Sequence, residues 1–273
     1  MRIDDLDPPR EMKGAADSIL RTLDRYGLHW DGEVVYQSQH NELYENALRK
    51  LNSRRLLYQC TCSRKQIKQT ASPGILGYIY PGTCRPKAAD HRSYEPCKAV
   101  ITRLNVGDET IGFKDLLQGN IEQNLASQIG DIVLKRADGF YAYHLAVVVD
   151  DWQQNITEIV RGIDLLPCTP LQIYLRKLLY PSSDLPGNRT YNHVHYCHLP
   201  VLVNLDNEKL SKQTRARPVS LDNIEDTLFT LLTYLQQNPP ATLKQATKAS
   251  ILEWAIDNWC VEKIVEKKQI RVD

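Results

Sequence analysis

The first fifty residues alternate short apolar runs with amphipathic helical patterns, and this alternation constrains the fold of the chain more than any other feature. Residues 3–6 indicate the end of a strand, and residues 34–36 indicate a second short strand. Apolar side chains at helical spacing predict helices over about 11–26 and 41–51. Strand–helix–strand–helix order is typical of an α/β fold with a parallel sheet.

Glycines, prolines and cysteines interrupt this pattern over residues 60–126, around strand-like runs at 99–104 and 110–116. We interpret this segment as a smaller inserted domain. Buried, β-branched segments follow it, at 131–135, 141–150, 156–160 and 195–203. After Pro218 the pattern becomes helical, and we expect Ser220 to cap the first helix of this tail.

Three cysteines and a tyrosine lie near one another in the inserted segment. Cys60 and Cys62 are separated by one residue, and Cys84 follows 22 residues after Cys62. Tyr80 lies four residues before Cys84. Three thiols and one oxygen donor can complete the four-coordinate shell that Zn²⁺ prefers. The same spacing also fits three unrelated reduced cysteines in a loop-rich stretch, so both interpretations stay open.

Positive charge is concentrated around these cysteines. The whole chain carries 34 Lys and Arg against 33 Asp and Glu, a formal net charge of +1. Residues 46–89 nevertheless contain nine basic side chains and no acidic one. Such a surface suits a phosphate backbone, although acids elsewhere could also balance it in space. The small net charge excludes a chain that coats nucleic acid over its whole surface.

Two lysines flank a serine in the string KLSKQ, formed by Lys209 to Gln213. Lysines on a mobile loop can grip the phosphates of a nucleotide and act best when charge builds in the transition state. Most strings of this kind are ordinary surface loops. The acidic opening RIDDLDPPR is more specific, because ligands of parallel sheets bind beyond the carboxyl ends of strands, where a carboxylate can hold an ammonium group.

Three histidines, His193, His195 and His198, also suggest a metal site. On a strand, however, the first two share a face and the third does not. No carboxylate lies nearby in sequence, so we interpret these histidines as structural.

Together these motifs resemble the glutamyl-queuosine tRNA(Asp) synthetase family, short paralogues of the catalytic domain of glutamyl-tRNA synthetase. The resemblance runs from Arg2 to at least Arg217. It rests on five ordered strings: RIDDLDPPR, the C-T-C…Y-x-x-x-C cluster, AYHLAVVVDD at 142–151, EIVRG at 158–162 and KLSKQ.

The resemblance implies an α/β, class I Rossmann-type parallel sheet, an inserted zinc-bearing acceptor-binding domain and a short helical C-terminal tail. The corresponding divisions are 1–59 and 127–218 for the two parts of the catalytic domain, 60–126 for the insert and 219–273 for the tail. Only about 60 residues follow the lysine loop, too few for the anticodon-binding part of a full glutamyl-tRNA synthetase.

The resemblance also implies a reaction and its residues. Members activate glutamate with ATP and Mg²⁺ to glutamyl-adenylate and transfer the glutamate to queuosine in the anticodon of tRNA(Asp). By position, Asp4 holds the glutamate ammonium, and Tyr143 and Arg161 recognise the rest of the amino acid. Lys212 stabilises the phosphate during adenylation, and Lys209 assists it in binding ATP. The implied zinc ligands are Cys60, Cys62, Tyr80 and Cys84.

The chain departs from the family pattern in two places. The family usually has Glu where this chain has Asp4, a shorter carboxylate of the same charge. The family's first strand and the following helix start carry an arginine, an F-A-P-S-P-S-G-like loop and an H-x-G-S/H motif that bind ATP and glutamate. These elements have no match here and are expected immediately before Met1. We therefore also consider a non-catalytic zinc-containing tRNA-binding remnant and a truncated glutamyl-tRNA synthetase acting on tRNA(Glu).

The sequence also bears on where the chain works. Its longest aliphatic run is far shorter than the roughly 20 residues that a spanning helix needs. Seven cysteines, an odd number without a secretion signal, indicate a reducing compartment. We expect a cytoplasmic monomer whose partners are glutamate, ATP and tRNA(Asp) carrying queuosine, with no membrane contact.

Overall fold

A computed structural model describes residues 1–8, 11–85, 100–181, 194–211, 216, 218–264 and 268–272 of the chain. The α-helices are α1 (Ala15–Tyr26), α2 (Asn41–Ser53), α3 (Arg64–Thr70), α4 (Leu125–Gln128), α5 (Tyr143–Gln153), α6 (Thr169–Leu179), α7 (Ile224–Tyr234) and α8 (Lys248–Asn258). The 3₁₀ helices are η2 (Gln37–Gln39), η3 (Ile163–Cys168), η5 (Ala241–Gln245) and η6 (Val261–Lys263).

The strands are β1 (Arg2–Ile3), β2 (Val35–Tyr36), β3 (Leu57–Cys60), β4 (Pro73–Gly74), β5 (Gly77–Tyr78), β6 (Ile101–Leu104), β7 (Thr110–Asp115), β8 (Gly119–Asn124), β9 (Ile132–Lys135), β10 (Glu158–Gly162), β11 (His195–Leu199), β12 (Val201–Val203) and β13 (Gln269–Arg271). The helices predicted over 11–26 and 41–51 are thus present as α1 and α2 with shifted ends. The strand predicted over 195–203 is divided into β11 and β12 at Pro200.

The sheets are mixed within the described residues. The largest has the order β10–β11–β7–β8, in which β10, β11 and β7 run parallel and β8 returns antiparallel to β7. A second sheet, β3–β6–β9, is antiparallel throughout. The pairs β1–β2 and β12–β13 are parallel. The predicted parallel sheet is therefore present in separate parallel pairings rather than as one continuous sheet.

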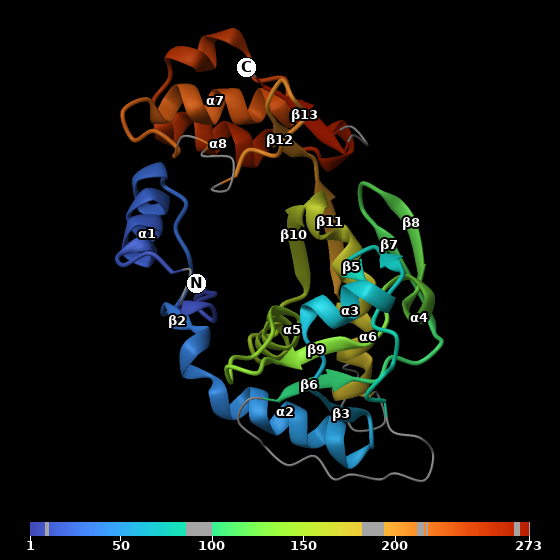
Figure 1. The fold of residues 1–273 in the computed structure, drawn as a ribbon. Helices are drawn as coiled ribbons and strands as arrows, with labels where there is room; N and C mark the ends of the chain where they lie inside the picture. The colour runs from blue at the N-terminus through green and yellow to red at the C-terminus, as the bar shows by residue number, and fades with distance from the viewer. Residues whose placement is uncertain are drawn as a thin grey trace.

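The main hydrophobic core lies between these sheets and helices α2, α5 and α6 (Figure 1). Leu48, Leu145 and Leu175, one from each helix, are fully buried in it. Leu104 of β6 and Ile111 of β7 belong to the same core, and their strands pair with β3, β9 and β11. Residues 101–124 are thus built into the same sheets and core as the segments around them, and the domain boundary at 126 stays a prediction.

Residues 141–150, which we grouped with the β-branched segments, form most of helix α5. Every side chain from Leu145 to Asp151 is buried. A run that is apolar on all sides carries no periodicity, so the sequence does not distinguish a buried strand from a buried helix.

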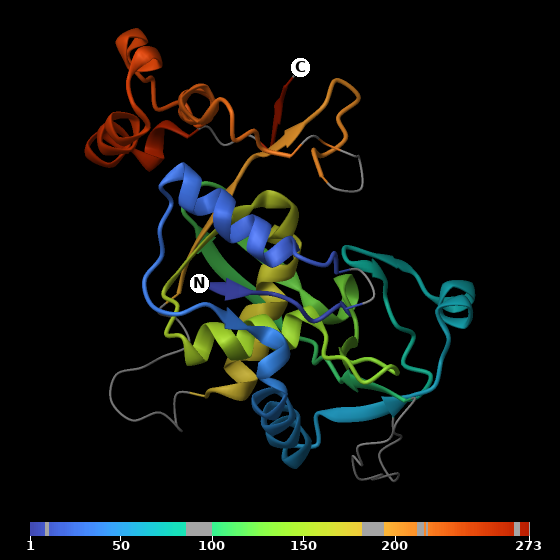
Figure 2. The ribbon, with the colours of Figure 1, turned by 90° about the vertical axis from the view of Figure 1, so that its left-hand side faces the viewer.

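The tail carries a second, smaller core formed by α7, α8 and η5, and Figure 2 shows these helices apart from the two larger sheets. Tyr26, at the end of α1, is buried in this core and donates a hydrogen bond from its hydroxyl to the carbonyl of Ser220 (2.5 Å). Gly27 ends α1 with φ at 76°, the left-handed conformation that glycine adopts readily just beyond a helix. The prediction that Ser220 caps α7 is wrong, because Asn223 precedes that helix and offers no side-chain cap. In the described part of the chain, no helix is long and apolar enough to cross a membrane.

We expect Leu145→Ala to destabilise the protein by about 2–5 kcal/mol, because the side chain is fully buried in the main core and its loss leaves a cavity. Urea unfolding followed by circular dichroism measures this change. The control is Ile256→Ala, whose side chain is 79% exposed on α8 and which should change the unfolding free energy by less than about 0.5 kcal/mol. Equal losses in the two variants would contradict the packing described here.

Candidate amino-acid and metal sites

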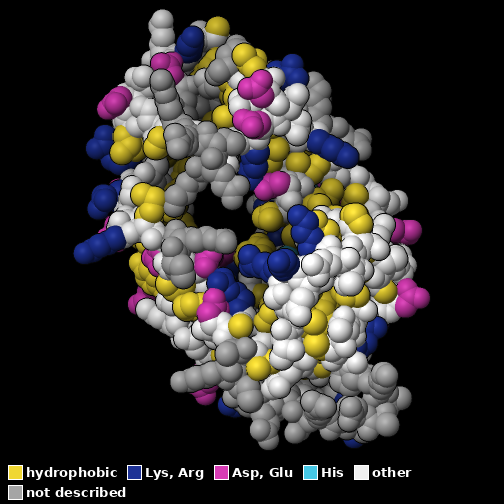
Figure 3. All heavy atoms as spheres, viewed as in Figure 1, with side chains coloured by type: hydrophobic (Ala, Val, Ile, Leu, Met, Phe, Trp, Pro, Cys, Tyr) yellow, Lys and Arg dark blue, Asp and Glu magenta, His cyan; other side chains and the backbone are white. Residues whose placement is uncertain are grey.

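A cavity of about 600 Å³ opens between β1, β2, α5 and β10. Asp4, Tyr143 and Arg161, the three residues that the resemblance assigns to glutamate, all line it. They come from the loop after β1, from the first turn of α5 and from β10. Figure 3 shows the hollow in this face of the molecule, with Lys and Arg side chains along part of its edge. Segments far apart in sequence thus meet at one surface.

Arg2 fixes the acidic side of this cavity. Its guanidinium donates from Nε to Asp4 Oδ1 (2.8 Å) and from Nη1 to Asp151 Oδ1 (2.6 Å) and Gln154 Oε1 (3.2 Å). Burial alone disfavours the charge of Arg2, but the hydrogen bond and charge of Asp151 outweigh it, so the pKa of Arg2 is raised. Asp4 is therefore ion-paired with Arg2, yet its side chain is 42% exposed and accessible to a further cation.

Arg161 supplies the positive side of the cavity. Its Nη2 donates to Thr169 Oγ1 (2.7 Å) and to Gln172 Oε1 (2.8 Å), and its Nε lies 3.2 Å from His198 Nε2. All three partners are neutral acceptors. Among the described residues, no carboxylate pairs with this guanidinium, so its full charge is available to an anionic group in the cavity.

A buried hydrogen-bonded pair lies directly behind Arg161. His198 Nδ1 is 2.6 Å from Asp115 Oδ2, and both side chains are completely buried. The His198 Nε2 is also 2.9 Å from Thr169 Oγ1. Our structural interpretation of the three histidines did not identify this role, because the partners come from β7 and α6 and only the register of the sheet brings them together.

Three polar side chains lie beside Arg161. His144 is next to Tyr143, its Nδ1 has no hydrogen-bond partner among the described residues, and burial together with the charge of Arg161 lowers its pKa to about 4. Burial raises the pKa of the Tyr143 hydroxyl, although Arg161 and the Gln172 amide oppose the shift. The Gln172 Nε2 is likewise buried without a partner in the described part of the chain. Arg161 is thus surrounded on this side by uncharged groups.

The structure brings the predicted metal ligands together. The thiol sulfurs of Cys60, Cys62 and Cys84 all lie within 4.8 Å of one another, and no other such cluster of three is found among the described residues. The Tyr80 hydroxyl lies 3.4 Å from the sulfurs of Cys60 and of Cys62. The Cys62 and Cys84 sulfurs are 3.5 Å apart, near the ~3.8 Å edge of a tetrahedron with 2.3 Å Zn–S bonds. The donor set and its spacing fit a tetrahedral ion.

Asp131 anchors the loop that carries Cys84. Its carboxylate accepts two hydrogen bonds from Arg85 (2.7 and 3.0 Å), one from the Tyr58 hydroxyl (2.5 Å) and one from the backbone N–H of Val106 (2.8 Å). Because Arg85 directly follows Cys84, this buried carboxylate holds the thiol in the cluster. Tyr58, Cys60 and Tyr80 form the small apolar core around it.

The lysine loop is described only in part. Lys209 forms an ion pair with Asp164 of η3, and Leu210 donates its backbone N–H to the Leu202 carbonyl (2.9 Å). Lys212, the residue that the resemblance places at the phosphate, lies outside the described residues. The structure therefore fixes only the base of this loop.

The pair Asp150 and Asp151 divides into two roles. Asp150 is fully buried and accepts from Gln37 Nε2 (2.8 Å), His40 Nδ1 (2.7 Å) and the Tyr44 hydroxyl (2.7 Å), so it joins η2 and α2 to α5. Asp151 faces the cavity and holds Arg2.

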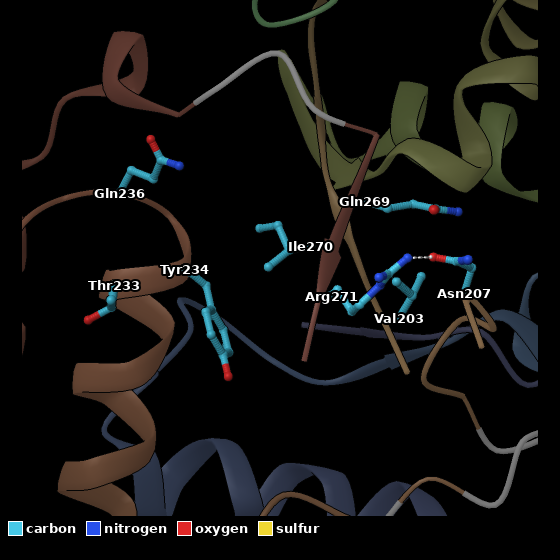
Figure 4. Close-up of a pocket in the computed structure, with 8 residues that line it drawn as sticks. All are labelled: Val203, Asn207, Thr233, Tyr234, Gln236, Gln269, Ile270 and Arg271. Carbon is cyan, nitrogen blue, oxygen red and sulfur yellow. Dashed lines mark hydrogen bonds between the residues drawn. The ribbon is translucent and has the colours of Figure 1, made fainter. Parts of the chain in front are cut away.

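A second cavity, of about 520 Å³, lies between β12, β13 and the end of α7. Figure 4 shows Tyr234, Gln269 and Ile270 around it, with the Arg271 guanidinium hydrogen-bonded to Asn207 (2.8 Å). None of the predicted site residues that the structure describes lines this cavity.

Comparison with known proteins places the chain in one class. Residues 1–237 match the family described as tRNA synthetases class I (E and Q), catalytic domain. The chain belongs to this family of class I synthetases, which confirms the resemblance found in its motifs.

Within that family the chain is similar to proteins named Glutamyl-Q tRNA(Asp) synthetase. The protein from Chromobacterium violaceum is 47% identical over 264 residues, which cover 97% of this chain and 83% of that protein. The protein from Methylococcus capsulatus is 42% identical over 273 residues, covering 100% of this chain and 83% of that protein.

A solved structure, a glutamate tRNA ligase from Elizabethkingia meningosepticum in complex with its amino acid, shares the fold with a TM-score of 0.69 at 17% identity. The match covers 100% of this chain, and the chain spans 60% of that structure's length.

We expect Cys84 to be alkylated first when iodoacetamide is added to protein stripped of metal. Burial raises its pKa, but hydrogen bonds with Tyr80, Thr61 and the neighbouring thiols outweigh burial and bring it to about 7. Since the thiolate is the nucleophile, its rate should rise as pH increases through about 7 and then level off. Burial raises the pKa of Cys168 and Cys197, which serve as internal controls in peptide mass spectrometry. Faster reaction at either control residue would contradict this assignment.

Proposed function

We propose that this protein activates glutamate with ATP to glutamyl-adenylate and transfers the glutamate to queuosine in the anticodon of tRNA(Asp). One observation carries the proposal: an Arg161 guanidinium with only neutral partners faces a cavity that also contains the Asp4 carboxylate. The relatives named Glutamyl-Q tRNA(Asp) synthetase support it at 42–47% identity over nearly the whole chain.

The charges of the cavity match those of a dicarboxylic amino acid. Asp4 offers a carboxylate to the ammonium group, and Arg161 offers a carboxylate the N–H groups of its Nη1, which have no partner among the described residues. Tyr143 lines the same cavity and presents a hydroxyl that can donate. An uncharged amide at the distal end of the ligand would leave the Arg161 charge unpaired, which favours glutamate over glutamine.

The lysine loop supplies the phosphate side of the site. We propose that Lys212 and Lys209 bind the phosphates of ATP, with Mg²⁺ accompanying the nucleotide. The base of the loop contacts η3 through Lys209 and Asp164, directly after the strand that carries Arg161. Charge that builds on the phosphate during adenylation is best met by such cations.

We propose that Cys60, Cys62, Tyr80 and Cys84 hold one Zn²⁺ as ligands. Zinc supplies a structural crosslink in such a closed site. The chain's own contribution is to fix the loop around the ion through Asp131 and Arg85.

The basic helix α3 next to this cluster is the proposed tRNA contact. Its Arg64, Lys65 and Lys68 are exposed, and the helix carries no acidic side chain. Such side chains bind phosphates without reading sequence, which suits contact with a tRNA backbone. The domain division into catalytic halves, zinc insert and helical tail, and a cytoplasmic monomer, belong to the same proposal.

Glutamate-dependent exchange of pyrophosphate into ATP, without tRNA, tests the activation step. We expect exchange with glutamate and little with glutamine, followed by labelling of tRNA(Asp) that carries queuosine but not of the same tRNA without it. Labelling of tRNA(Glu) instead would identify a glutamyl-tRNA synthetase activity. No exchange at all would overturn the catalytic proposal in favour of a tRNA-binding protein.

We expect Lys212→Ala to lower the rate of adenylation by about 100-fold while changing the KM for glutamate much less, because the lysine serves charge that develops in the transition state. Single-turnover adenylation measures the rate. Lys244→Ala, an exposed lysine of η5, is the control and should leave both quantities unchanged. Equal effects of Lys212→Ala on rate and on glutamate binding would count against this role.

We expect about one zinc per chain by plasma mass spectrometry, as a closed structural site requires. Cys84→Ser should lower the zinc content and the melting temperature, since it removes a ligand. Cys260→Ser is the matched control, because Cys260 lies outside the cluster, near Glu262, and should retain the metal. A zinc content unaffected by Cys84→Ser would refute the assignment of the ligands.

A further inference from the structure

We propose that the buried Asp115–His198 pair positions Arg161. The pair fixes which groups donate and which accept in the hydrogen bonds between the guanidinium and the protein, so that the remaining N–H groups of Arg161 face the anionic group of the substrate. The inference rests on the proposed glutamate site. Neither residue lines the cavity, so both act through Arg161.

The Asp115 carboxylate is held from both of its oxygens. Oδ1 accepts from the backbone N–H groups of Leu117 (3.0 Å), Gln118 (2.9 Å) and His198 (3.3 Å), and Oδ2 faces His198 Nδ1 at 2.6 Å. Burial alone raises the pKa of Asp115, but these hydrogen bonds, with that of His198 the strongest, outweigh it and lower the pKa. Asp115 is therefore ionised and acts only as an acceptor.

The tautomer of His198 follows from its two partners. Asp115 can only accept, so Nδ1 carries a proton and donates it. Arg161 can only donate, so the Nε2 that faces its Nε at 3.2 Å must accept and carries no proton. The ring is therefore neutral, with its proton on Nδ1. A proton on Nε2, even one received by Thr169 Oγ1 at 2.9 Å, would leave Arg161 Nε without an acceptor among the described residues.

The same direction of donation, from Arg161 to its neighbours, holds at Thr169 and Gln172. Arg161 Nη2 donates to Thr169 Oγ1, whose own hydrogen is then left for the two acceptors beside it, His198 Nε2 at 2.9 Å and the Leu165 carbonyl at 3.4 Å. Arg161 also donates to Gln172 Oε1, which fixes the orientation of that amide. Both the Nε and the Nη2 of Arg161 are thus held by neutral acceptors, and the remaining N–H groups are left for a ligand in the cavity.

Replacing Asp115 by Asn would move the His198 proton from Nδ1 to Nε2 and so exchange the donor and acceptor nitrogens of the ring. The single amide oxygen would remain with the three backbone N–H groups, and the amide NH₂ would face His198 Nδ1. His198 would then have to accept at Nδ1 and carry its proton on Nε2, against the N–H of Arg161. A wrong tautomer of this kind disables a catalytic histidine in serine proteases without changing the geometry. Here it displaces the group that binds the substrate.

The test compares four single variants of the full chain in pyrophosphate exchange. We expect Asp115→Asn and His198→Met to raise the KM for glutamate by about tenfold or more, because a displaced Arg161 misplaces the carboxylate, with the KM for ATP changed by less than about threefold. His198→Gln keeps one donor and one acceptor on a side chain of similar reach, so its KM for glutamate should stay within about threefold of the unmodified chain.

Glu109→Gln is the fourth variant and the control. It removes a half-exposed ion pair (2.7 Å) with Lys177, which lies on α6 like Thr169 and Gln172, and it should change neither KM. A KM for glutamate unchanged in both Asp115→Asn and His198→Met, or equal increases in the two KM values, would overturn the proposal, since a purely structural role would not separate them.

A second measurement needs no substrate. In protein labelled with ¹⁵N-histidine, we expect the His198 ring to show a protonated Nδ1 and an unprotonated Nε2, and the reverse in Asp115→Asn; His198→Gln assigns the signals. A protonated Nε2 in the unmodified chain would overturn the proposal. If the unmodified chain shows no exchange, the proposed glutamate activation fails while the tautomer result still decides the polarity.

Discussion

The buried charge of Asp115 is the constraint on which the amino-acid site depends. An isolated carboxylate in a protein interior is costly, so the chain must surround it with donors. The donors come from the turn after β7 and from β11. These two strands pair where Tyr196 of β11 lies opposite Asp115 of β7. Satisfying one carboxylate therefore fixes the meeting of β7 with β11, the orientation of His198 and, through it, the position of Arg161.

The same physical solution recurs at two other carboxylates. Asp131 gathers Tyr58, Arg85 and a backbone N–H around the thiol cluster. Asp150 gathers Gln37, His40 and Tyr44 between α2 and α5. Each acid joins segments that are distant in sequence, and removing any one partner would leave an uncompensated polar group. The thiol cluster and the wall of the cavity are thus both placed by buried acids rather than by apolar packing alone.

Sequence patterns predicted the local parts of this protein well. Helical periodicity located α1 and α2, and the spacing of Cys60, Cys62, Tyr80 and Cys84 identified side chains that do meet in space. The pairing of Asp115 with His198 was not predictable, because it depends on the register between β7 and β11, which no local pattern encodes. Helix α5 was missed for a related reason: its burial on all sides removes the periodicity that would distinguish it from a strand.

The tail links the two sides of the large hollow. Tyr26, at the end of α1, packs against the helices of the tail. The last strand of the tail, β13, pairs with β12 at the base of the lysine loop. Folding of the tail and the spacing between α1 and β12 are therefore thermodynamically coupled. A ligand that bridges the acidic opening and the lysine loop would, by mass action, make the tail harder to unfold, although it touches no residue there.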